Sequence, residues 1–144
     1  MIWGLKTVAF FDIWTLEHLL SGISIGALSI QINKKVFFNT INVDSKIIKT
    51  SYFDLTFVLL LAYIWETIEH YLETGLAGQS VEFWFQGVEF WANRFISDPL
   101  ITVLGYYIAK NYFFLVNPSR IISFIWLIVH IFVFPHSMYL HEIF

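Results

Sequence analysis

The sequence predicts an all-α integral membrane protein, a single domain (1–144) with about four transmembrane helices and a short interfacial segment between the second and third. Hydrophobic residues make up 58% of the chain and charged residues only 13%, which is too apolar for an ordinary soluble domain. Several apolar stretches approach the roughly 20 residues that a helix needs to cross a bilayer. The expected spans are about 10–30, 53–72, 99–116 and 121–139.

Each predicted span is bounded by a recognisable signal. The first gives way to the basic segment QINKK (31–35), and the second contains the continuous apolar run FVLLLAYIW (57–65). The third begins just before Pro99, and proline suits the first turn of a helix. The fourth follows Arg120, and Pro135 is expected to kink or end it.

Between the second and third spans, residues 73–98 contain the run VEFWFQGVEFW. Aromatic residues alternating with acids are typical of a segment that lies at the membrane interface. The ionisable residues expected to reach water at the interface are Glu73, Glu82, Glu89, His136 and His141. His130, near the middle of the fourth span, is expected to be a packed interior histidine.

Charge and cysteine content exclude several classes of protein and of site. The formal net charge is −3 without any basic patch, so no nucleic-acid partner is expected. The chain has no cysteine, which excludes disulfides, thiolate metal sites and cysteine nucleophiles. The N-terminus lacks the features of a signal peptide, so the first span is expected to stay in the mature protein.

The distribution of basic residues predicts the orientation. Those on one side of the predicted bundle are Lys34, Lys35, Lys46, Lys49, Lys110 and Arg120. The opposite side holds only Lys6 and Arg94. Because the more basic side stays in the cytoplasm, both termini are expected on the outer side of the membrane. Alternating helix directions place most acids and histidines on that same side.

A polar stripe marks the second span. Glu66, Glu69, His70 and Glu73 are spaced i, i+3, i+4 and i+7, so they share one face of an otherwise apolar helix. A charged Asp, Lys or Arg costs roughly 2.5–3.5 kcal/mol at the centre of a membrane helix. We therefore expect Glu66 and Glu69 to be buried and either paired or metal-bound, with His70 at the rim.

Residues of the first and third spans are expected to join this stripe. His18 shares a helical face with Gly22 and Gly26, whose G-x-x-x-G spacing lets another helix approach closely. Asp98 begins the third span in the same leaflet. Both residues also have a simpler interpretation than a functional site. His18 can make a polar contact between helices, and Asp98 can accept N-cap hydrogen bonds at the start of its helix.

Asn93 and Arg94 are expected to be binding residues at the rim of this site. A guanidinium beside many carboxylates either neutralises them, which we favour, or binds an anionic headgroup or phosphate.

Two kinds of chemistry remain open for the cluster. Glu and His ligands suit a divalent metal such as Zn, Fe or Mn, with candidate ligands His18, Glu66, Glu69 and His70. Their spacing matches neither the Glu-x-x-His of di-iron bundles nor the H-E-x-x-H motif. Alternatively, a carboxylic acid and a histidine act as general acid and base without metal. The candidate catalytic residues are His18, Glu66, Glu69 and Asp98.

Three short motifs, in this order, resemble the VanZ-like superfamily of small bacterial membrane proteins. They are a histidine four residues before a glycine, a Glu-x-x-Glu, and an aspartate seven residues before a glycine. The matching pairs are His18 with Gly22, Glu66 with Glu69, and Asp98 with Gly105. The family commonly has an aspartate four residues before its histidine, whereas here Asp12 lies six before, and Asn93 stands where the family has an acid.

The resemblance covers about residues 12–109 and implies a role at the cell envelope, since VanZ itself is linked to teicoplanin resistance. It implies no particular reaction. The predicted function is therefore an outward-facing acid/His pocket that binds or processes a lipid or lipid-linked envelope molecule, with membrane lipids as partners. The alternative is a non-catalytic accessory subunit of a larger membrane complex. A pocket predicts that His18, Glu66 and Glu69 face a cavity, whereas an accessory subunit predicts that they are fully paired without one.

Overall fold

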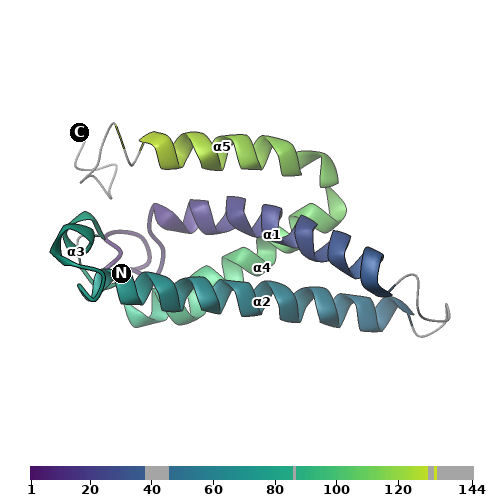
Figure 1. Cartoon of the computed structure of the whole chain (residues 1–144), viewed down its shortest axis with the longest axis horizontal. Helices are drawn as coiled ribbons and strands as arrows, with labels where there is room; N and C mark the ends of the chain where they lie inside the picture. Colours follow the sequence, from purple (N-terminus) through teal and green to yellow (C-terminus); the bar gives the residue numbers. More distant parts are fainter. Residues whose placement is uncertain (38–45, 86, 130–131, 133–144) are drawn as a thin grey trace.

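The long helices run back and forth along the length of the molecule (Figure 1). The computed structural model describes residues 1–37, 46–85, 87–129 and 132, and this part of the chain is all-helical, as predicted. In chain order its elements are α1 (Trp14–Phe37), α2 (Lys46–Glu73), α3 (Gln79–Phe85), the π-helix η2 (Asn93–Ser97), α4 (Asp98–Asn111), the 3₁₀-helix η3 (Phe113–Leu115) and α5 (Val116–Ile128).

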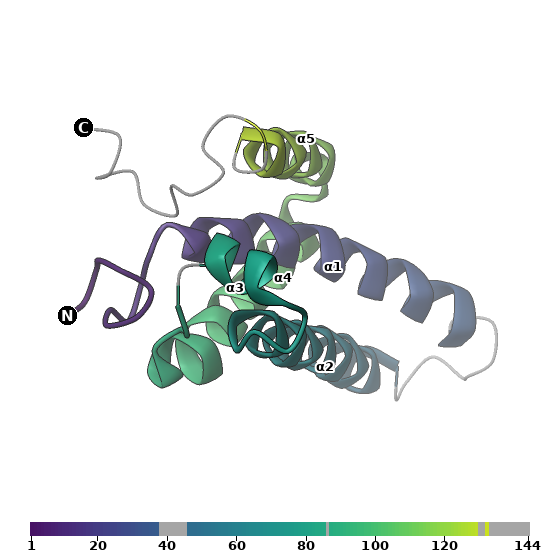
Figure 2. The same ribbon diagram turned by 60° about the vertical axis from the view of Figure 1, so that its left-hand side comes forward.

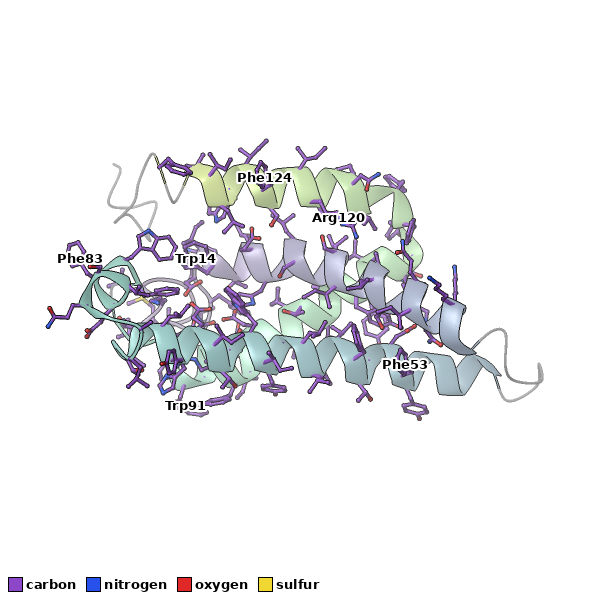
Figure 3. The ribbon with its side chains drawn as sticks, viewed as in Figure 1. Trp14, Phe53, Phe83, Trp91, Arg120 and Phe124 are labelled. Carbon is purple, nitrogen blue, oxygen red and sulfur yellow. The ribbon has the colours of Figure 1, made fainter. Side chains whose placement is uncertain are left out.

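The starts of α1 and α4 and the ends of α2 and α5 meet at the end of the bundle near α3 (Figure 1). Trp14 lies at this end and Phe53 at the other (Figure 3). The most extensive packing joins α1 to α4, while α5 lies on the side of α1 away from α2 (Figure 2). The predicted alternation of helix direction is therefore confirmed for these four helices.

Asp12 sets the start of α1. Its Oδ1 accepts hydrogen bonds from the backbone N–H groups of Trp14 (2.7 Å) and Thr15 (3.1 Å), while the Thr15 hydroxyl accepts one from the Asp12 backbone. This reciprocal cap satisfies donors that a helix start leaves unpaired. The helix consequently begins at Trp14, later than the predicted start of the span at Phe10.

Other boundaries also differ from the predicted ones. Helix α1 continues past Ile30 to Phe37, and α2 already begins at Lys46. Helix α4 ends at Asn111 and α5 begins at Val116, whereas the third span was expected to continue to 116. Predictions for His130, Pro135, His136 and His141 fall outside the described residues.

Length and composition identify fewer candidate membrane spans than the four predicted. Among the described residues, Tyr52–Glu73 of α2 is long and apolar enough to cross a membrane. The helices Asn93–Asn111 and Phe113–Ile128 pass the same test only as a pair, with a bend of 115° between them. At 1.5 Å per residue, α4 with its 14 residues is only about 21 Å long, shorter than the hydrocarbon core of roughly 30 Å.

Glycines allow α1 and α4 to cross in close contact. A Cβ placed on Gly22 would lie 2.4 Å from the carbonyl oxygen of Thr102, and one on Gly105 would lie 2.6 Å from that of Leu19. Gly26 is similarly close to the α4 backbone. The close approach predicted from the G-x-x-x-G spacing is therefore confirmed, and α4 is the partner helix.

A buried polar group at the opposite end ties α1, α2 and α4 together. The Asp54 carboxylate accepts hydrogen bonds from the Ser29 hydroxyl (3.1 Å), the Asn33 amide (2.9 Å) and the Tyr106 hydroxyl (3.5 Å). The sequence-based interpretation did not anticipate this group, because its four members are spread over three helices, with Ser29 and Asn33 on α1, Asp54 on α2 and Tyr106 on α4.

Candidate functional site

The four candidate catalytic residues are buried and come together at the α3 end of the bundle. His18 of α1 lies between two carboxylates. Its Nδ1 is 3.6 Å from Oε1 of Glu66 in α2, and its Nε2 is 3.5 Å from Oδ2 of Asp98 in α4. Glu69, one turn beyond Glu66, offers an oxygen within 4.8 Å of ligand atoms of both His18 and Glu66.

A network of ion pairs lies beside these residues, with Arg94 in its middle. The guanidinium donates to Oε2 of Glu73, and the same nitrogen is 3.5 Å from Oε2 of Glu89. The other carboxylate oxygen of Glu73 lies 2.5 Å from the Lys6 ammonium. The nitrogen Nη1 of Arg94 lies 3.1 Å from Nδ1 of His70, whose side chain is otherwise exposed. Arg94 thus lies among carboxylates, as its predicted neutralising role requires.

The expectation that Glu73 and Glu89 reach water at the interface is wrong. They are only 1% and 5% exposed, because the N-terminal loop and η2 bring Lys6 and Arg94 against them. The Glu89 backbone N–H also donates to Glu73 at 3.1 Å. Glu82 is exposed, as expected.

Asn93 connects the start of α1 to this network. Its amide nitrogen donates to Oδ2 of Asp12 at 2.9 Å and to Oε1 of Glu89 at 3.2 Å. Asp12 therefore caps α1 with one oxygen and contacts η2 with the other. Lys6 was missed as a site residue, although it is one of only two cations on this side of the predicted bundle.

The N-cap alternative for Asp98 is wrong. Ser97, which precedes it, already has helical backbone angles because η2 runs directly into α4. Neither carboxylate oxygen of Asp98 receives a hydrogen bond from the described residues, and the same is true of Glu66. These two buried carboxylates face His18 and each other without the hydrogen bonds that burial normally requires.

A cavity of about 520 Å³ opens beside the cluster, between α1, α2 and α5 and next to α3. His18 and Glu69 form part of its wall. Much of the remainder is apolar, including Ile25, Trp65 and Leu127. Trp14, another lining residue, packs against Trp84 of α3 with ring centroids 6.4 Å apart. The site therefore combines ionisable groups with an apolar chamber.

Two groups of three side chains have ligand atoms close enough together to hold a metal ion. One is His18, Glu66 and Glu69, and the other is Glu66, Glu89 and Asp98. His70, a predicted ligand, belongs to neither group of the described residues, since its ring faces Arg94.

Glu89 lies outside the candidate spans, and burial, followed by the nearby carboxylates of Glu69 and Glu66, raises its pKa to about 9. Between its ordinary pKa of 4.5 and about 9, the folded protein therefore keeps a proton that the unfolded chain releases. The contribution of Glu89 to stability is largest at low pH and is lost as the pH rises through this window.

In EDTA, the melting temperature of the wild-type protein is expected to fall between pH 5.5 and 8.5 more steeply than that of Glu89→Gln. Glutamine keeps the oxygen that accepts from Asn93 but cannot ionise. Each kcal/mol lost lowers the melting temperature by roughly 2–4 °C in a chain of this size. The exposed Glu82→Gln should follow the wild-type curve, and parallel curves for Glu89→Gln and wild type would contradict the assignment.

No protein-family model, curated protein or solved structure matches the chain.

Proposed function

We propose that this chain is a small membrane protein that binds a lipid or lipid-linked envelope molecule, with its tail in the cavity and its headgroup at the acid/His cluster. The observation that carries the proposal is the cavity itself, because Glu17, His18 and Glu69 line a chamber whose other walls are largely apolar. Its volume of about 520 Å³ falls within the roughly 300–1,000 Å³ of small-molecule sites. An amphiphile suits such walls, since its apolar and polar parts each meet a matching surface.

In this proposal the helix bundle lies in the membrane, with α2 long enough to cross it by itself and with both termini and the cluster on the outer side. Lys34 and Lys35 at the end of α1, and Lys110 near the end of α4, then lie towards the cytoplasm, as the positive-inside rule requires. Many exposed large apolar side chains, such as Phe124 at 64% exposure, support contact with lipid. The VanZ-like resemblance is part of the same proposal and adds the cell envelope as the place of action.

The alternative of a non-catalytic accessory subunit is favoured by the other half of the cluster. Glu73 lies between Lys6 and Arg94 and contacts both cations, which is typical of a structural network. The lipid-binding proposal is preferred because a purely structural cluster does not require a chamber beside it.

Filling the chamber tests the proposal. Ala62 is 4% exposed and lines the cavity, so Ala62→Phe is expected to displace the bound tail and weaken lipid binding. A loss of 1.4 kcal/mol corresponds to about tenfold in affinity, and we expect at least that loss. The measurement is native mass spectrometry of lipids retained through purification, followed by titration with the retained lipid.

Leu60→Phe is the matched control, because Leu60 lies on the same helix but is 55% exposed and outside the cavity lining. It should retain lipid like the wild type. Equal retention by all three proteins would reject the cavity as a lipid site, and absence of bound lipid from the wild type would favour the accessory subunit.

A further inference from the structure

The buried charges at the α3 end of the bundle do not balance. Six carboxylates of the described residues are buried here, namely Asp12, Glu66, Glu69, Glu73, Glu89 and Asp98. The buried cations beside them are Lys6 and Arg94. If all were ionised, the excess would be four negative charges, which is prohibitive in a low-dielectric interior without compensation.

The carboxylates without a close cation are concentrated at Glu66 and Asp98. Lys6 and Arg94 contact Glu73 most closely, whereas Arg94 is 3.9 Å from Glu66. Glu66 and Asp98 are 1% and 0% exposed, and none of their four carboxylate oxygens receives a hydrogen bond from the described residues. These oxygens are therefore available to a ligand that carries positive charge.

The geometry defines where that ligand fits. His18, Glu66 and Glu69 place three ligand atoms within 4.8 Å of one another, and so do Glu66, Glu89 and Asp98. Glu66 belongs to both groups. A carboxylate with two oxygens can bridge two metal ions, as carboxylates do in two-metal sites whose ions lie roughly 3.5–4 Å apart.

We propose that this cluster binds two divalent cations bridged by Glu66. His18 and Glu69 complete one site, and Glu89 and Asp98 complete the other. Two such ions carry four positive charges, which equals the excess of buried carboxylates over buried cations. The donors are one imidazole and four carboxylates without any thiolate, a set that suits Mn²⁺ or Fe²⁺.

The inference deepens the proposed function and rests on it for the role of the site, since His18 and Glu69 also line the lipid cavity. Its rival is a proton-only cluster, in which carboxylic acids remain neutral and no ion binds. Metal binding and lipid retention are measured separately, so either can fail without the other.

The test is Mn²⁺ binding to the purified full-length protein in detergent, stripped with EDTA and followed by electron paramagnetic resonance. Wild type is expected to bind two ions per chain and to show the spin coupling of ions that share a bridging ligand. Glu69→Gln and Asp98→Asn should each lose one ion. Glu66→Gln should lose both, because it removes a ligand from each site.

The isosteric Glu82→Gln is the control, since Glu82 is exposed and belongs to neither group; it should bind two ions. Fewer than two ions per wild-type chain, two uncoupled ions, or loss of only one ion in Glu66→Gln would overturn the proposal. The wild-type measurement decides the matter even where a variant does not fold. If the wild type retained lipid but bound no Mn²⁺, the metal site would be rejected and the proposed function kept. If it bound two coupled Mn²⁺ ions but no lipid, the proposed function would be rejected and the metal site kept.

Discussion

Replacing Arg94 by alanine is expected to destabilise the protein by about 3–5 kcal/mol, the cost of leaving a buried charge without its partner. Arg94 is 4% exposed. Its guanidinium donates to Glu73 and approaches both Glu89 and Glu66. Removing it leaves Lys6 as the remaining buried cation beside the six carboxylates of the described site. The melting temperature in detergent should fall by roughly 6–20 °C.

Arg94→Lys should recover only part of this loss. An ammonium is a compact point charge, whereas the guanidinium presents a planar array of donors that reaches several carboxylates at once. Arg120→Ala is the control, because Arg120 is exposed on α5 and should change the melting temperature by no more than about 1–2 °C. If Arg94→Ala lowered the melting temperature as little as Arg120→Ala, that result would contradict the central role of this guanidinium.

The local pattern of the sequence was enough to predict that the four candidate catalytic residues converge. Glu66 and Glu69 share a helical face because of their spacing, and opposite helix directions bring the starts of α1 and α4 to the end of α2. His18 and Asp98 follow from that alternation alone. These predictions depend only on helical geometry and on the order of the helices, which the sequence displays directly.

The missed residues depend on tertiary contacts that have no local signature. Glu73 and Glu89 look interfacial by position, but the loop before α1 folds back over them. The backbone N–H of Phe90 donates to the Lys6 carbonyl at 2.9 Å, which holds this loop in place. Asp98 likewise looks like a helix cap next to proline, yet the π-helical turn η2 continues into α4 and removes the free end that a cap would serve.

The two halves of the polar cluster differ in a way that bears on function. In the half around Glu73, this carboxylate is paired with both Lys6 and Arg94, so these residues provide a rigid support. The half around Glu66 and Asp98 lacks hydrogen bonds and adjoins the cavity through His18. Rigid support behind groups whose charge is unsatisfied is the arrangement expected of a preorganised site.

The crossing of α1 and α4 positions His18 against Asp98, and adding a single methyl group there is expected to have a large effect. In Gly22→Ala the new Cβ would lie 2.4 Å from the Thr102 carbonyl oxygen and 2.8 Å from its Cα. Backbone atoms cannot move aside as a side chain can, so the two helices must separate. Overpacking typically costs about 1–3 kcal/mol and occasionally more, and we expect about 3 kcal/mol here.

Gly105→Ala should cost a similar amount, since its Cβ would lie 2.7 Å from the backbone of Gly22 itself. The double variant should be less destabilised than the sum of the two, because the first substitution already opens the gap that the second needs. Gly4→Ala is the matched control: the one close contact of its Cβ would be the sulfur of the exposed Met1 side chain at 2.6 Å, and this side chain can rotate away. The melting temperatures of the four variants measure these losses of stability. If the losses in the double variant were strictly additive, or if Gly22→Ala destabilised the protein as little as Gly4→Ala, the helices would not cross in backbone contact.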